Sequence, residues 1–192
     1  MYIGRALQSL LRQDFTAWEL IAVDVGSVDK SFEILINFKK NYKNVIVIHQ
    51  QHQNLAVGRN TGIKLSRGNF ITFLDSDDEY LPSHLASRYN YMTNHPDIDL
   101  IHGGIIIEGN PFVVDKYNSN KIVHLSECVI GATFFGKRKV FENLDGFNDV
   151  YSEDSEFLER ALKNFKVEKV DYPTYIYHRD TPDSITNKIL LQ

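Results

Sequence analysis

Three carboxylates lie within four residues, directly after a short apolar run. Residues 70–74 have the length and composition of a strand, and Asp75, Ser76, Asp77 and Asp78 follow them. Mg²⁺ and Mn²⁺ prefer oxygen ligands, often bind one or two carboxylates, and keep coordination positions for water and phosphate oxygens. The cluster therefore fits a divalent cation with bound phosphates. It also fits a solvated turn that caps the next helix, because Asp and Ser dominate such turns.

A second pair of acids stands at the start of a predicted helix. Glu153 and Asp154 precede an apolar stripe at helical spacing, which predicts a helix over residues 153–165. A carboxylate beside an acceptor hydroxyl can remove its proton as a general base. Acids also stabilise the first turn of any helix through the helix dipole, so this position allows both roles.

Two more polar residues lie where a phosphate ligand would need them. Arg59, in a predicted helix before the acidic cluster, can present its planar fork to phosphate oxygens, or it can be an ordinary surface arginine. Asp24 ends a predicted strand ahead of Gly26 and Ser27, where an acid either contacts a ligand or simply forms the turn.

Apolar spacing predicts alternating helices and strands in the first half of the chain. We expect helices over residues 3–11, 31–42 and 55–66, and strands over residues 18–23, 45–49 and 70–74. Strands joined through helices run parallel with right-handed crossovers, and ligands bind beyond their carboxyl ends. Asp24 and the acidic cluster are thus expected to face one crevice.

The second half predicts a different pattern. Its expected elements are a helix over residues 82–94, antiparallel hairpins within 98–124, a strand over 131–136, the helix over 153–165, and closing strands over 167–171 and 175–177. Together the two halves predict an α/β fold with a mostly parallel central sheet flanked by helices. The whole chain, residues 1–192, is expected to form a single domain.

Composition narrows the partners and the compartment. A formal charge of -4 and a pI near 6.0 give no electrostatic case for nucleic acid. Cys128 is the single cysteine, which excludes an intrachain disulfide. The sequence has neither an apolar run of about 18 residues nor a signal-peptide pattern. We expect a cytoplasmic protein, and peripheral attachment to a membrane is compatible with this location.

Four short motifs occur in a fixed order, at residues 23–29, 56–62, 74–78 and 152–156. Residues 146–148 and 177–178 extend the pattern. This order resembles the GT-A fold glycosyltransferases, specifically the large inverting family 2, over nearly the whole chain. The resemblance implies a GT-A fold, a nucleotide-sugar donor, and Mn²⁺ or Mg²⁺ held against the donor diphosphate.

The resemblance also implies roles for the acidic cluster. Asp77 matches the direct metal ligand of the family. Asp75, Ser76 and Asp78 match the part of the nucleotide-sugar site that contacts the ribose or sugar, or that orients the ligands. The metal would assist departure of the nucleotide as a Lewis acid.

The remaining motifs match other parts of the family site. Asp154 corresponds to the catalytic base that deprotonates the acceptor, and Glu153 is assigned to the nucleotide-sugar site beside it. Arg59 and Asn60 would shape the nucleotide pocket. His178 matches a histidine that joins the metal or diphosphate in several members, although a structural histidine fits equally well.

Asp24 would contact the nucleoside in a protein of this family. The next position, Val25, usually carries a second aspartate that recognises the base, typically uracil. Loss of such a buried hydrogen bond costs roughly 1 to 3 kcal/mol, so a UDP-sugar donor is compatible with the resemblance but the base stays open. The acceptor would be a polysaccharide, a lipid-linked saccharide or another hydroxyl-bearing molecule.

The beginning of the sequence departs from the family pattern. Family members usually start with an apolar strand that lies centrally in the sheet, whereas Met1 already falls within the first expected helix. We therefore expect an N-terminally truncated GT-A domain with exposed strand edges, through which a homodimer would form. Two alternatives stay open: a noncatalytic GT-A remnant that binds or scaffolds, and a sugar nucleotidyltransferase.

Overall fold

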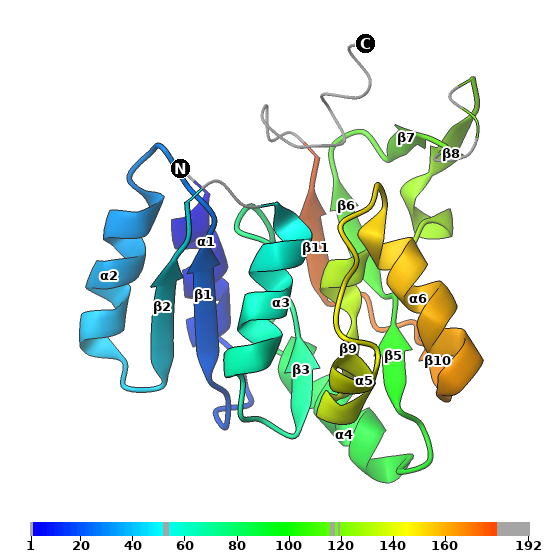
Figure 1. Cartoon of the computed structure of the whole chain (residues 1–192), viewed down its shortest axis with the longest axis horizontal. Helices are drawn as coiled ribbons and strands as arrows, with labels where there is room; N and C mark the ends of the chain where they lie inside the picture. The colour runs from blue at the N-terminus through cyan, green and yellow to red at the C-terminus, as the bar shows by residue number, and fades with distance from the viewer. Residues whose placement is uncertain (1, 52–53, 116–117, 119, 180–192) are drawn as a thin grey trace.

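The computed structural model describes residues 2–51, 54–115, 118 and 120–179, and its helices and strands form an α/β fold (Figure 1). The first part of the chain alternates between helices and strands, as its apolar spacing predicts. Its elements are α1 (Ile3–Leu11), β1 (Leu20–Asp24), α2 (Ser31–Asn41), β2 (Val45–His49), α3 (Leu55–Leu65) and β3 (Phe70–Thr72). β1 and β2 pair in parallel, so Asp24 lies opposite His49 at their carboxyl ends.

A four-stranded sheet forms the centre of the remaining structure. Its strand order is β10-β5-β9-β3, with β5 at Leu100–His102, β9 at Phe135–Lys137 and β10 at Val167–Lys169. β5 and β10 are parallel, whereas β9 runs antiparallel to both β5 and β3. β3, β5 and β10 therefore point the same way, and their carboxyl ends lie at one edge of the sheet.

Two smaller sheets complete the described strands. The first has the order β4-β11-β6, from β4 (Glu79–Tyr80), β11 (Tyr175–His178) and β6 (Ile105–Glu108). The second is the hairpin of β7 (Phe112–Val114) and β8 (Ile122–His124). Because β11 is parallel to β6 and antiparallel to β4, the end of the described chain is tied to the turn that follows the acidic cluster.

The helices of the second part lie against these sheets. They are α4 (His84–Asn94), α5 (Arg138–Asn143), α6 (Glu153–Asn164), and the short 3₁₀ helices η1 (Leu125–Glu127) and η2 (Gly131–Thr133). Figure 1 shows α3 and α6 on the near side of the strands and α1 behind β1. An aromatic core lies between the helices and the central sheet. In it, the ring centroid of Phe157 is 4.5 Å from that of Phe147 and 5.3 Å from that of Phe141. This core fixes the start of α6 relative to the sheet.

The predicted hairpins within residues 98–124 are wrong except for β7 and β8. β5 and β6 are consecutive but belong to different sheets, and each pairs in parallel with a strand from the end of the described chain. Gly103 and Gly104 between them both have positive φ, and a Cβ on Gly104 would lie 2.1 Å from the Tyr172 carbonyl oxygen. The two glycines therefore form a close crossing of the chain with the later segment, where we expected a hairpin turn.

Other elements differ in detail from the prediction. α5 and β4 were not expected, and residues 131–136 divide between η2 and the start of β9. Among the described strands, β1 pairs only with β2 and β3 only with β9. In the described part of the chain, no helix has both the length and the apolar character required to cross a bilayer.

Candidate active site

Arg59 is the centre of the site, because its guanidinium joins two acidic segments that are far apart in the sequence. Asn54 caps the start of α3 by accepting a 2.9 Å hydrogen bond from the Val57 N–H. One turn later, Arg59 Nη1 donates to Glu153 Oε1 at 2.8 Å and Nη2 donates to Asp75 Oδ1 at 3.2 Å. α3 therefore holds the acid after β3 and the acid at the start of α6 together.

The Arg59 side chain is only 7% exposed, and its surroundings favour the charged form. Burial alone would lower its pKa, but the neighbouring carboxylates of Asp75, Glu153 and Asp154 raise it above its ordinary value. The guanidinium carbon also lies 5.7 Å from the ring centroid of Phe73 and 5.3 Å from that of Phe147. Arg59 is therefore a permanent cation inside an acidic site.

Glu153 is held by that cation, yet burial dominates its titration. Its side chain is 17% exposed. Burial raises the pKa of the Glu153 carboxyl; the Arg59 charge works in the opposite direction, and the nearby Asp154 adds to the rise. The carboxylate is thus directed at Arg59, with the neighbouring acid close enough to affect it electrostatically.

Asp154 is oriented by hydrogen bonds from three groups. Its Oδ2 accepts from the Gly131 N–H at 3.1 Å, and its Oδ1 accepts from the Ser155 N–H at 2.7 Å and the Ser152 hydroxyl at 3.2 Å. Ser152 has the left-handed backbone conformation, with φ of 58°, immediately before α6. This strained entry turn places the carboxylate over η2, where its position is fixed.

Gly131 is required by the close approach of Asp154 and Arg59 to its backbone. A Cβ at this position would lie 2.8 Å from Asp154 Cβ and 2.9 Å from Arg59 Nη1. Real Cβ atoms do not approach that closely, so any side chain here would displace one of the two. Sequence reasoning missed Gly131, although a glycine between Ile130 and Ala132 in an apolar run is a signal of close approach.

Asp78 is buried and anchors β11 to the acidic turn. Its Oδ2 accepts from the Tyr175 hydroxyl at 2.6 Å and its Oδ1 accepts from the His178 N–H at 2.8 Å. Burial raises the pKa of the Asp78 carboxyl to about 8, with the charge of Asp75 adding to the rise. The structure gives Asp78 a structural role in joining two segments 100 positions apart.

His178 lies beside the acidic cluster but both of its ring nitrogens face carboxylates. Nε2 is 3.0 Å from Glu79 Oε1, and Nδ1 is 3.1 Å from Glu108 Oε2. These contacts describe a hydrogen-bonded histidine between β4 and β6. A metal ligand at this position would first have to exchange one of those carboxylate contacts for the ion.

The other two members of the acidic cluster are at the surface of the site. Ser76 is exposed, and Asp77 is partly exposed. The Arg5 guanidinium, from α1, donates to the Asp77 carbonyl oxygen and lies 3.4 Å from Glu79 Oε1. Sequence reasoning missed both Arg5 and Glu79, whose contacts connect α1 to this turn.

Asp24 is the member of the predicted site that β1 provides. Its side chain is buried; Oδ1 accepts from the Ser27 N–H at 3.0 Å, and Oδ2 lies 2.8 Å from His49 Nδ1. Burial alone would raise its pKa, but the hydrogen bonds from Ser27 and His49 lower it. The next side chain, Val25, packs against α3, because a Cβ on Gly58 would lie 2.9 Å from Val25 Cγ1. Asp24 thus closes the turn after β1.

Asn60 clamps the backbone ahead of the α6 entry turn. Its Nδ2 donates to the Phe147 carbonyl oxygen and its Oδ1 accepts from the Phe147 N–H, both at 2.8 Å. Gly146, with φ of 71°, leaves room for this clamp, since a Cβ there would lie 2.1 Å from Asn60 Oδ1. In this structure the amide that is predicted to shape a nucleotide pocket holds the loop that carries Phe147.

The side chains at this edge offer many oxygen atoms to a metal ion, but they do not form a complete coordination shell. Among the residues that the structure describes, no group of three or more His, Cys, Asp or Glu side chains is arranged to hold a metal ion. Mg²⁺ in nucleotide sites is commonly held by one or two carboxylates and completed by phosphate oxygens and water. Asp75 and Asp77 fit that smaller requirement.

The fold and site together define the class of this chain. Residues 1–145 match the family model described as glycosyl transferase family 2, and the chain belongs to that family. The expected GT-A type α/β fold is confirmed by solved structures: Staphylococcus aureus TarS 1-349 in complex with UDP-GlcNAc has a TM-score of 0.78 at 21% identity, over 97% of this chain and 57% of that one.

Two curated relatives illustrate the family membership. The uncharacterized glycosyltransferase EpsJ of Bacillus subtilis (strain 168) is 30% identical, over 96% of this chain and 59% of its own length. The Escherichia coli protein WfgD, a UDP-Glc:alpha-D-GlcNAc-diphosphoundecaprenol beta-1,3-glucosyltransferase, is 28% identical over 88% of this chain and 68% of its own. The chain thus spans only about three fifths of EpsJ.

Proposed function

We propose that this chain carries the catalytic site of a metal-dependent, inverting glycosyltransferase, which transfers a sugar from a nucleotide-sugar donor to an acceptor hydroxyl. One observation carries the proposal: Arg59 bridges Asp75 and Glu153 at 3.2 and 2.8 Å. Through that bridge, the acidic turn after β3 and the start of α6 form one site. A sugar transferase needs both, one for the donor diphosphate and one for the acceptor.

The acidic turn is the donor side in this proposal. Asp77, with support from Asp75, would hold Mn²⁺ or Mg²⁺, and the ion when bound would supply charge neutralisation to the leaving diphosphate. A mannosyltransferase from Pyrobaculum calidifontis, similar in fold with a TM-score of 0.71, is described in complex with GDP-Man and Mn²⁺. Arg59 would keep the local charge of the carboxylates compensated, so that they stay in place when the donor is absent.

Asp154 is the acceptor side. We assign it the role of general base, which takes the proton of the acceptor hydroxyl while that oxygen attacks the anomeric carbon. Attack from the face opposite the leaving nucleotide inverts the configuration at that carbon. The hydrogen bonds from Gly131, Ser152 and Ser155 restrict the carboxylate to one orientation, which lowers the cost of reaching the reactive geometry.

Isothermal titration calorimetry with UDP, GDP and their sugars, with and without Mn²⁺, tests the donor side. We expect binding that requires Mn²⁺ and that Asp77→Ala weakens by at least about tenfold. Asp97→Ala is the matched control, because Asp97 is an exposed acid in the loop before β5. Among the residues that the structure describes, it forms an ion pair only with Lys166.

The same measurements separate the alternatives. If none of the nucleotides binds with or without Mn²⁺, the chain acts as a noncatalytic GT-A domain. Release of pyrophosphate from a nucleoside triphosphate and a sugar 1-phosphate would identify a sugar nucleotidyltransferase instead. Retention of Mn²⁺-dependent binding in Asp77→Ala would remove Asp77 as the metal ligand.

A further inference from the structure

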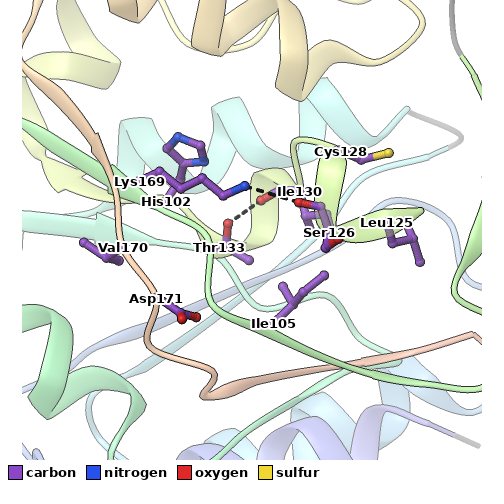
Figure 2. A pocket seen from close by; sticks show the side chains of 10 residues that line it. All are labelled: His102, Ile105, Leu125, Ser126, Cys128, Ile130, Thr133, Lys169, Val170 and Asp171. Carbon is purple, nitrogen blue, oxygen red and sulfur yellow. Dashed lines mark hydrogen bonds between the residues drawn. The ribbon is translucent and has the colours of Figure 1, made fainter. Parts of the chain in front are cut away.

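A cavity of about 430 Å³ opens at the carboxyl ends of β5 and β10 (Figure 2). Its lining comes from His102, which ends β5, from Lys169 and Asp171 at and beyond the end of β10, and from the segment between η1 and η2. The volume is within the range of small-molecule sites, and the location is the edge where open α/β sheets bind ligands. None of the candidate site residues described above lines it.

One wall of this cavity is shared with the candidate base. Ile130 and Thr133 line the cavity, and Gly131 between them donates its N–H to Asp154. The Thr133 hydroxyl is itself fixed, since it donates to the Ile130 carbonyl oxygen at 2.7 Å and accepts from the Gly103 N–H. A molecule in the cavity would therefore lie on the other side of one backbone turn from the Asp154 carboxylate.

Two polar side chains of the lining are available to a ligand. Within the described part of the chain, the His102 imidazole and the Asp171 carboxylate have no hydrogen-bond or ion-pair partner. Lys169 is exposed and donates to the Ser126 carbonyl oxygen at 3.2 Å, as Figure 2 shows. Burial and the Lys169 charge lower the pKa of His102 to about 4, so the ring is neutral at pH 7, with one donor and one acceptor nitrogen.

The charges and the apolar surface of the lining select the kind of ligand. One ammonium, Lys169, and one carboxylate, Asp171, cancel, which disfavours a phosphate or another anion. Ile105, Ile130 and Val170 supply apolar wall between these polar groups. A pyranose matches this combination, because its hydroxyls donate to carboxylates and imidazoles while its C–H face packs on aliphatic side chains.

We propose that this cavity is the acceptor subsite and that it binds a neutral sugar unit of the acceptor through His102 and Asp171. The assignment of this cavity to the acceptor rests on the proposed function, whereas its assignment to a sugar rests on the lining of the cavity alone. Because one backbone turn separates the cavity from Asp154, the bound unit would be a neighbour of the sugar that is glycosylated. The substrate class is therefore a glycan with an uncharged residue beside the one whose hydroxyl faces Asp154.

Cys128 provides a direct test, because the only cysteine of the chain lines this cavity. The full 192-residue chain would be alkylated with iodoacetamide at pH 8.5, since burial raises the pKa of the Cys128 thiol and the thiolate is the reactive form. The rate would be measured with methyl β-glucoside, methyl β-galactoside or N-acetylglucosamine, and separately with inorganic phosphate or UDP.

We expect at least one of the three sugars to slow alkylation in a saturable way, with half-protection on the order of 10 mM, as for weak ligands. Phosphate and UDP should leave the rate unchanged. His102→Gln and Asp171→Asn should each raise the half-protection concentration by about tenfold, whereas Glu33→Gln, an exposed acid on α2, should not.

Several outcomes would overturn the proposal. They are no protection by any of the sugars, protection that survives in both cavity variants, protection by phosphate, which would mean an anion site, and protection by UDP, which would place the cavity in the donor site. If a variant fails to fold, as judged by circular dichroism, the sugar series on the parent chain still decides the point.

This test is separate from that of the proposed function. Sugar protection without nucleotide binding in the calorimetry would leave a saccharide site but remove the transferase. Nucleotide binding without sugar protection would keep the transferase and remove this acceptor subsite.

Discussion

Arg59 Nη1 lies 2.8 Å from Glu153 Oε1, although 94 positions separate the two residues. With the second contact from Nη2 to Asp75, this bridge ties α3, the turn after β3 and the start of α6 into one unit. Because Arg59 is 7% exposed, removal of its charge would leave two acids close together with no cation between them.

We predict that Arg59→Met lowers the free energy of unfolding by about 3 kcal/mol, the cost of leaving a partly buried pair without one partner. Arg12→Met is the matched control, because Arg12 makes a 3.2 Å contact with Glu79 but is 56% exposed, and its loss should cost less than about 1 kcal/mol. Urea unfolding followed by circular dichroism measures both. Equal effects of the two substitutions would show that the Arg59 bridge adds no more stability than a surface pair.

The catalytic assignment predicts a selective loss in Asp154→Asn. The amide keeps the size of the side chain and can still accept from Gly131, but it cannot take a proton. Turnover should fall by about 10² to 10⁴-fold, and the nucleotide affinity measured by calorimetry should stay within about twofold. Normal turnover in this variant would exclude Asp154 as the base.

The close approach at Gly131 predicts a loss of activity that requires no change of charge. In Gly131→Ala the new Cβ would meet Asp154 Cβ at 2.8 Å, so the carboxylate must move. A displacement of the carboxylate by about 1 Å should reduce turnover by about 10²-fold. Gly62→Ala, which meets no atom within 4 Å inside α3, should instead raise stability by about 0.5 to 1 kcal/mol and leave turnover intact. Full activity in Gly131→Ala would contradict the fixed position of the base.

His102 predicts a pH dependence of stability. Its folded-state pKa of about 4 lies below the ordinary 6.5. Between these values the unfolded chain binds a proton that the folded protein excludes, so the free energy of unfolding falls as the pH drops from 6.5 towards 4. In His102→Gln this loss should be smaller by about 1 to 3 kcal/mol, measured by urea unfolding at pH 7 and pH 4.5. An identical loss in the variant would show that His102 titrates normally.

The strand edges predict self-association of the 192-residue chain. β1 pairs only with β2 and β3 only with β9 among the described strands, which leaves hydrogen-bonding edges for another strand. We predict a homodimer at micromolar concentration, measured by light scattering. A monomeric mass across that range would rule this out.

The sequence by itself determined the alternating helices and strands of the first part of the chain and the order of the motifs. The periodicity around Leu7 and Leu10 predicts α1 with the bounds that the structure has, and the apolar run over residues 18–23 predicts β1, which the structure places at Leu20–Asp24; both patterns are local. The acidic residues from 75 to 78 and the pair Glu153 and Asp154 were also recognisable, since short motifs are carried by neighbours in the chain. The family model that matches residues 1–145 includes the first three of the four ordered motifs.

Only the tertiary structure decided which of these side chains share a site and what each one contacts. The pairing of β5 with β10, the clamp of Asn60 on Phe147 and the burial of Asp78 beneath Tyr175 all join residues separated by more than 60 positions. No local pattern encodes such contacts, because they depend on how the helices and strands pack against one another. For the same reason the cavity at His102 could not be read from the sequence: the segments that line it meet only when the sheet has formed.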